Sequence, residues 1–205
     1  PEKEYKAPSP SEYAASMNFR ELRGKLETDG FFKRNVFKEA WAFIQVAGLY
    51  AAGQFFAYSN PWLATLLLGL GMVQAGWLGH DYVHGRGPLC DALRYMPTLL
   101  NGHSVEWWSQ KHSMHHTFTN EEHLDNDVMM EPFFFLRPPS ESGRPDNALR
   151  KYQHIYGYPL LSIMFWLWRF HSVEGAWKRK DKKELVLLGV NYLWLATCMP
   201  WQVAI

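Results

Sequence analysis

The chain alternates between charged stretches and long apolar stretches that carry no ionised side chain. Residues 40–80 contain no Asp, Glu, Lys or Arg, and neither do residues 185–205. Charge-free apolar runs of about 18 residues or more are typical of membrane-spanning helices. A Ser-Asn-Pro turn signal at residues 59–61 divides the first run into two predicted helices, 41–58 and 61–78. At about 1.5 Å per residue each covers roughly 27 Å, which nearly crosses a hydrocarbon core of about 30 Å.

The charged segments have a pattern of their own. Residues 16–26 read as a short amphipathic helix after a linker-like opening. Residues 79–151 read as irregular and histidine-rich. The next apolar stretch, 152–168, is densely apolar only over its second half and contains Pro159. The densely apolar part is too short for a typical membrane span, and we therefore expect an interfacial helix near 152–170.

Basic residues orient the predicted spans. Lys33, Arg34 and Lys38 precede the first span, and five more Lys or Arg residues lie within 178–183. Because cytoplasmic flanks are enriched in Lys and Arg, both segments are expected on the cytoplasmic side. A crossing near 155–175 is the main rival. The predicted organisation is a cytoplasmic segment 1–39, a transmembrane hairpin 40–80, a cytoplasmic histidine-box region 81–183 and a further span starting within 184–205. The expected fold class is an all-α, multi-pass membrane domain.

Composition narrows the function classes. Of 205 residues 47% are hydrophobic, which is too much apolar surface for a disordered chain. Aromatic residues make 16%, and Trp and Tyr are typical of membrane interfaces. The net charge is +1, with no basic run interleaved with aromatics, which argues against nucleic-acid binding. Two cysteines, Cys90 and Cys198, argue against a disulfide scaffold or a cysteine zinc site. A buried helical hairpin of a soluble protein is the alternative to a membrane hairpin.

Histidine is the exceptional residue type, because six of the nine lie between residues 80 and 116. The sequence HDYVH at 80–84 places His80 and His84 four apart, on one face of a helix. The sequence HSMHH at 112–116 adds His112, His115 and His116 on another helical face. Imidazole suits iron, zinc and copper. The intervening chain is long enough to bring the two patterns together, which predicts a shared, nitrogen-rich metal site. The alternative is a set of surface or core histidines.

Three stretches resemble the membrane fatty-acid desaturases, and most of all the front-end acyl desaturases. They are GHDYVHG at 79–85, WWSQKHSMHH at 107–116 and NEEHLDNDV at 120–128. The resemblance covers roughly residues 18–205. It implies two non-haem iron ions, molecular oxygen as oxidant and electrons from cytochrome b5, either as a separate protein or as a fused cytochrome domain. It also implies a multi-pass location in the endoplasmic reticulum membrane and a fatty acyl lipid or acyl-CoA as substrate.

The resemblance carries the metal-ligand role to His80, His84, His112, His115 and His116. The family's third histidine box, usually QxxHH, does not occur by residue 205. These residues alone are therefore expected to lack desaturase activity. A fatty acyl or sphingolipid hydroxylase with similar boxes and a non-catalytic metal-binding membrane fragment are the alternatives.

Several neighbouring residues receive secondary roles. Asp81 is either a carboxylate that orients a ligand imidazole or a surface charge. His123, Asp125 and Asp127 match the family segment, or else form a solvated turn. Trp107 and Trp108 are expected to be interfacial anchors or packing beneath the site. Met114 is read as core, and the expected non-ligands are His103, His154 and His171.

Overall fold

The fold is entirely helical in the part of the chain that is described. The computed structural model describes residues 7, 9–121, 123–128, 130, 131, 133–136, 138 and 146–204. Within these ranges every regular element is a helix, which confirms the predicted all-α class. Parts of the predicted segments 1–39, 81–183 and 184–205 lie outside the described residues. The chain divides into two compact units, Pro1–Phe43 and Ile44–Ile205.

The first unit contains α1, Pro10–Thr28, which is longer than the predicted helix over 16–26. The extra length comes from a capping box at its start. The Ser9 side chain accepts a hydrogen bond from the Glu12 N–H, and the Glu12 carboxylate accepts one from the Ser9 N–H at 2.7 Å. Pro10 is well suited to the first helical turn. Backbone N–H groups there have no acceptor within the helix, so the N–H that proline lacks is not missed. The segment around Ser9, whose composition resembles a linker, is therefore the start of a helix.

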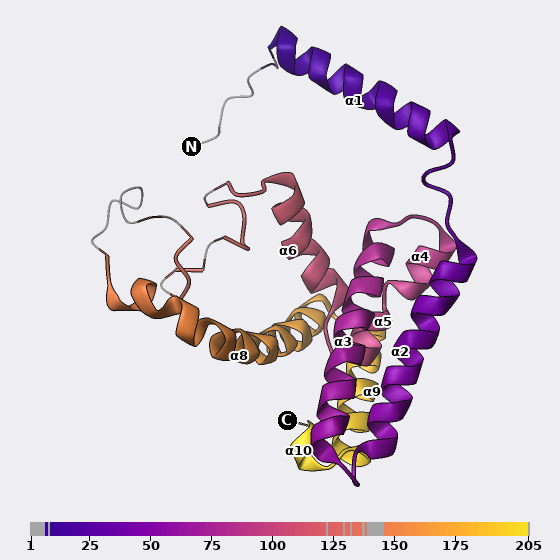
Figure 1. Cartoon of the computed structure of the whole chain (residues 1–205), viewed down its shortest axis with the longest axis vertical. Coiled ribbons are helices and arrows are strands. Elements are labelled where there is room, and N and C mark those ends of the chain that lie inside the picture. The colour runs from indigo at the N-terminus through magenta and orange to yellow at the C-terminus, as the bar shows by residue number, and fades with distance from the viewer. Residues whose placement is uncertain are drawn as a thin grey trace. The chain divides into compact units, whose positions relative to one another are not determined.

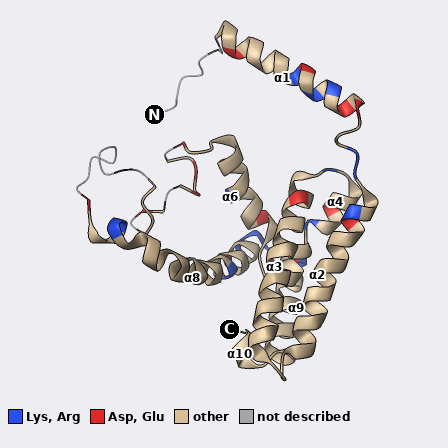
Figure 2. Cartoon of the chain, viewed as in Figure 1, with Lys and Arg blue, Asp and Glu red and all other residues tan. Residues whose placement is uncertain are grey.

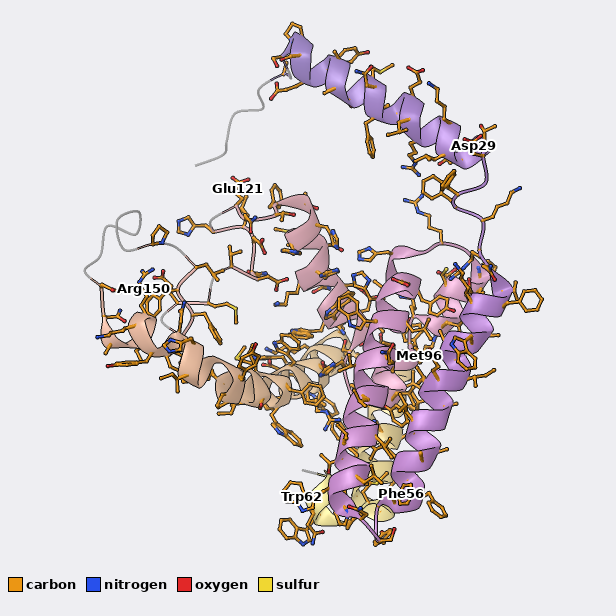
Figure 3. The ribbon with its side chains drawn as sticks, in the orientation of Figure 1. Asp29, Phe56, Trp62, Met96, Glu121 and Arg150 are labelled. Atoms are coloured by element: carbon orange, nitrogen blue, oxygen red, sulfur yellow. The ribbon has the colours of Figure 1, made fainter. Side chains whose placement is uncertain are left out.

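The predicted apolar hairpin is present as α2 and α3 (Figure 1). Helix α2 is Val36–Phe56 and α3 is Pro61–His84, and the Asn60 side chain caps α3 by accepting from the Leu63 N–H. The labelled Phe56 and Trp62 lie together at the closed end of the hairpin (Figure 3). Helix α3 extends beyond the predicted end at residue 78. Its last two turns therefore carry the HDYVH sequence.

The segment after α3 is more helical than its composition predicted. It forms α4 (Pro88–Leu93), α5 (Met96–Asn101) and α6 (Val105–Thr117). Helix α8, Ala148–Arg179, then runs without interruption through Pro159 and covers the predicted interfacial helix. Lys180 ends it in the left-handed conformation, and α9 (Lys182–Cys198) and α10 (Trp201–Ala204) follow.

The end of α5 is the polar centre of the second unit. The carbonyl oxygens of its last turn have no partner within the helix. Tyr50 of α2 and Asn191 of α9 both donate to the Leu100 carbonyl, and Arg169 of α8 donates to the Asn101 carbonyl. Gly102 follows with φ of +70°, and an added Cβ would lie 2.8 Å from Asn191 Oδ1. This turn therefore requires glycine, and helices far apart in the sequence hold it in place.

Helices α2, α3 and α9 carry few charged side chains and several exposed hydrophobic ones. By length and composition, one helix within the described residues, α3, is able to cross a bilayer. Figure 2 shows few charged residues along α2, α3 and α9, whereas α1 carries both signs of charge. Large hydrophobic side chains on these helices are exposed, among them Ile44, Leu66 and Leu193. Exposed apolar side chains in such number need a cover other than water.

Candidate metal centre

The two histidine patterns lie on α3 and α6, and a tight approach of α5 to α3 sets their positions. Gly79 of α3 lies directly against Pro97 of α5, so a Cβ at position 79 would collide with the proline ring. Helix α6 begins four residues after α5, and the Ser104 side chain caps it by accepting from the Trp107 N–H. The chain between the two patterns is thereby folded back, and the end of α3 faces α6.

Four of the five predicted ligand histidines meet as one group. His80, His84, His112 and His116 each offer a ring nitrogen, and these atoms all lie within 4.8 Å of one another. We call this group the histidine quartet. His112 is its centre, because its Nε2 lies 3.0 Å from Nε2 of His80 and 2.8 Å from Nε2 of His116. His84 contacts the His116 ring, with a centroid distance of 4.7 Å. The predicted meeting of the two patterns is thus observed for these four.

The surroundings of the quartet keep its central imidazole neutral. Burial lowers the pKa of His112, and the neighbouring His116, His80 and His84 lower it further, to about 4. A neutral imidazole has a free lone pair on one nitrogen and is the form that binds metals. Four ring nitrogens that lie within 4.8 Å of one another suit a first-row transition metal.

Trp108 forms the floor of the quartet. Its ring stacks on His112 with a centroid distance of 4.1 Å and an interplanar angle of 25°. The same ring contacts the edge of His80 at 5.5 Å. A large apolar ring in this place excludes water from one side of the histidines and restricts the rotation of His112. This is the packing role expected of Trp108.

His115, the fifth predicted ligand, belongs to a second group. Its Nδ1 lies 2.9 Å from Asp125 Oδ2, and Asp127 completes a set whose ligand atoms lie within 4.8 Å of one another. Asp127 is also paired with Lys111. The His115 ring remains a neighbour of the quartet, with centroid distances of 5.9 Å to His112 and 5.7 Å to His116.

Asp125 is the most deeply buried acidic residue near the histidines, with 0% of its surface exposed. Its carboxylate accepts hydrogen bonds from the backbone N–H of Asn120 at 2.8 Å and of Asp127 at 2.9 Å. Burial alone would raise the pKa of Asp125, but these two hydrogen bonds and the one from His115 outweigh it, and the pKa lies below its usual value. Asp125 is therefore an ionised acceptor, so His115 Nδ1 is the donor.

The remaining sequence candidates are members of neither group. The Asp81 side chain is 76% exposed and approaches His80 Nδ1 only at 3.4 Å. His123 is exposed, with φ of +71°. His103 packs on the Phe165 ring, and burial, aided by Arg169, lowers its pKa to about 4. His154 and His171 are exposed on α8.

An apolar cavity of about 450 Å³ adjoins the quartet. Helices α3, α5, α6 and α8 and the turn between α5 and α6 enclose it, and His80 and His112 form part of its wall. Most of the remaining lining is hydrophobic or aromatic, and includes Val73, Trp77, Val83, Trp108, Phe165 and Trp168. Cavities of this size and character suit an apolar ligand.

A buried carboxylate that the sequence analysis did not single out anchors the start of α6. Glu184 of α9 is fully buried and accepts from Ser104 Oγ at 2.5 Å and from the Glu106 N–H at 3.0 Å. Arg179 at the end of α8 donates to the same carboxylate at 2.9 Å. In the sequence Glu184 stands out only as an acidic residue at the edge of an apolar run. Such a position ordinarily marks the start of a helix.

Known proteins are similar to this chain in sequence. The fatty acid desaturase family matches residues 57–204. An acyl-lipid 8-desaturase of Rebecca salina is 30% identical over 133 residues, which are 60% of this chain and 31% of that protein. A Delta(6)-fatty-acid desaturase of Caenorhabditis elegans is 29% identical over 189 residues, or 86% of this chain and 42% of that protein. An acyl-lipid (9-3)-desaturase of Physcomitrium patens is 26% identical over 202 residues, or 86% of this chain and 38% of that protein.

The chain spans 31–42% of the length of these curated relatives. No solved structure matches it. The family match includes both histidine patterns and the cavity, and it extends over most of the chain. The chain therefore belongs to the fatty acid desaturase family, in which it is similar to the front-end acyl desaturases.

Proposed function

We propose that this chain is part of an enzyme that introduces a double bond into a long-chain fatty acyl substrate, with molecular oxygen as oxidant. The observation that carries the proposal is the histidine quartet, in which four imidazoles from two helices converge beside an apolar cavity. The relatives described above are all fatty-acid or acyl-lipid desaturases, which supports the reaction type.

The metal centre of the proposed enzyme is a pair of non-haem iron ions. His80, His84, His112 and His116 are the ligands this chain would supply from the quartet, and His115 is a fifth from the adjoining face of α6. With molecular oxygen, the irons supply an oxidant strong enough to remove hydrogen from an unactivated C–H bond. Trp108 keeps His112 oriented and shielded from water, so the donor set is held in place before metal binds.

The cavity is the proposed site of the acyl chain. Its aromatic and aliphatic walls offer an apolar chain a dry environment, and His80 and His112 sit in the same wall. A methylene group in the cavity is thereby brought to the metal ligands. Excluding water from this space also prevents side reactions of the oxidant.

The membrane is the proposed setting, with α2, α3 and α9 as spans of a multi-pass protein in the endoplasmic reticulum. The exposed hydrophobic residues of these helices would face lipid, and exposed aromatics gather where α2 and α3 meet: Phe55, Tyr58 and Trp62. Helix α8 carries exposed Tyr152, Ile155 and Tyr158 and suits the membrane surface. Electrons would come from cytochrome b5, which the family resemblance supports.

Product analysis tests the proposed reaction. The full-length protein, expressed in a yeast host and fed a range of fatty acids, should give a new double bond that depends on oxygen. Gas chromatography with mass spectrometry of the methyl esters measures it, and the purified protein should contain iron. A hydroxylated product would instead support a hydroxylase. A purified protein without iron and a host without new product would contradict the proposal.

The topology gives a separate prediction. Ser59 in the hairpin turn and Lys182 at the start of α9 should lie on opposite sides of the membrane, because α3 crosses once between them and α8 does not cross. The Ser59→Cys and Lys182→Cys variants, in a background with Cys90 and Cys198 replaced by alanine, should differ in labelling by a membrane-impermeant maleimide on intact microsomes. Equal labelling of both, before and after detergent, would contradict this topology.

A further inference from the structure

The second histidine group consists of His115, Asp125 and Asp127 and lies beside the quartet. His115 shares α6 with His112 and His116, yet its Nδ1 faces Asp125 and not the quartet. A lone acidic cluster could itself hold a cation. Here, however, the carboxylates already have partners: Asp125 accepts from two backbone N–H groups, and Asp127 is paired with Lys111. The group is therefore a supporting structure.

Asp125 has the contacts of a residue that orients another. Within the described part of the chain its buried carboxylate has no Lys or Arg partner. Its three donors there are the Asn120 N–H, the Asp127 N–H and the His115 ring. The His115 side chain is 30% exposed, whereas Asp125 is fully covered. Two contacts fix the carboxylate to the loop, and the third fixes the imidazole to the carboxylate.

We infer that Asp125 is a positioning residue whose carboxylate holds the proton of His115 on Nδ1 and leaves the Nε2 lone pair for a metal ion. A histidine that binds metal through one nitrogen commonly donates its other N–H to a carboxylate, which fixes the tautomer and strengthens the ligand. The inference rests on the proposed function, because it assumes that the histidines bind iron. It assigns to the loop after α6 a part in the metal centre.

The backbone of the turn that carries Asp125 fixes its carboxylate in position for the hydrogen bond with His115 Nδ1. Asn120 has φ of +61°, a conformation that Asn adopts more readily than most residues, and this aims its N–H at the carboxylate. Thr119 Oγ1 donates to the His115 carbonyl at 2.7 Å, and the Asp125 N–H donates to the Glu121 carbonyl at 2.9 Å. The loop is thereby fastened to the end of α6.

Asp81, the carboxylate that the sequence suggested for the same role, is the matched control. It too neighbours a quartet histidine, but it is 76% exposed and lies 3.4 Å from His80 Nδ1. An exposed carboxylate at that distance orients an imidazole poorly. Replacing it removes the same charge near the metal site without removing a buried contact.

A double-mutant cycle on the full-length protein tests the inference. The apparent Kd for Fe(II), measured anaerobically against a competing chelator, should rise about 10–100-fold for Asp125→Asn. It should rise comparably for His115→Gln, and the double variant should match the His115→Gln variant within about twofold, because Asp125 acts through His115. Asp125→Glu, which keeps the charged carboxylate that Asp125→Asn lacks, should recover part of the affinity. Asp81→Asn should stay within about threefold of wild type.

Loop distortion is the competing explanation, and Asn120→Ala measures it. This variant strains the same turn but leaves both the carboxylate and His115 in place. An Fe(II) affinity as weak as that of Asp125→Asn would show that the loop alone matters and would overturn the inference. Additive effects in the cycle, or wild-type affinity in Asp125→Asn, would overturn it as well. A wild-type protein that binds no iron would overturn the proposed function itself.

Discussion

Product formation should fall below detection when His116 is replaced by Gln in the full-length enzyme. Glutamine preserves approximate size and polarity, but its amide nitrogen has no lone pair for a metal. His116 Nε2 lies 2.8 Å from the central His112 Nε2, so the change opens one side of the quartet. The His116 side chain is exposed near the end of α6, and its loss removes little apolar burial. We therefore expect membrane protein levels close to wild type and an iron content below half of wild type.

His171→Gln is the control for this variant. His171 is an exposed histidine on α8 that pairs with Glu174 at 3.3 Å and belongs to neither histidine group. It should leave activity and iron content largely intact. Unsaturated product is measured by gas chromatography beside an immunoblot for abundance. Full activity of the His116 variant would remove this residue from the metal centre and weaken the proposed iron chemistry.

The apolar hairpin and the meeting of the histidine patterns were predictable from the sequence. Spacing alone places His80 one helical turn before His84, and His112 one turn before His116, since residues four apart share a helical face. The Ser-Asn-Pro turn predicted where α2 would end and α3 begin. These features depend on short-range periodicity and on turn residues, which a sequence displays directly.

The orientation of His115 away from the quartet was not predictable from spacing and turn residues alone. Successive residues on a helix point about 100° apart, so His115 and His116 lie on opposite sides of His112. The spacing of HSMHH is compatible with three ligands on one broad face, or with two histidines on one side and the third on the other. The loop that carries Asp125 decides between these arrangements, and its path depends on contacts beyond α6.

The helix expected near 152–170 already contained Pro159, but the full length of α8, Ala148–Arg179, was not predicted. Proline removes one backbone hydrogen bond from a helix interior, which usually interrupts the helix. Here the helix continues, and packing against α6 and α9 supports it: Trp168 of α8 contacts Trp107 of α6 at 6.3 Å. Tertiary packing thus supports α8 against the local preference of proline.

Removing the Glu184 carboxylate should destabilise the second unit more than any exposed substitution. In Glu184→Ala the guanidinium of Arg179 loses its carboxylate partner and keeps only Ser104 Oγ, and the Ser104 hydroxyl and the Glu106 N–H lose their acceptor. Breaking one side of a buried charged network costs several kcal/mol, because the groups left behind are desolvated and unpaired. We expect the free energy of unfolding to fall by about 3 kcal/mol, with a fall in Tm of roughly 6–12 °C for a protein of this size.

The effect should reach the metal centre, because Glu184 holds the start of the helix that carries His112 and His116. A loosened α6 would hold these ligands less firmly, so the iron content of the purified full-length protein should fall together with its Tm. Glu174→Ala on α8 is the matched control. Glu174 is 40% exposed and pairs with Lys178 at 2.6 Å, and surface pairs of this kind contribute about 0–1 kcal/mol. Equal Tm values for the two variants would show that the Glu184 network does not hold α6.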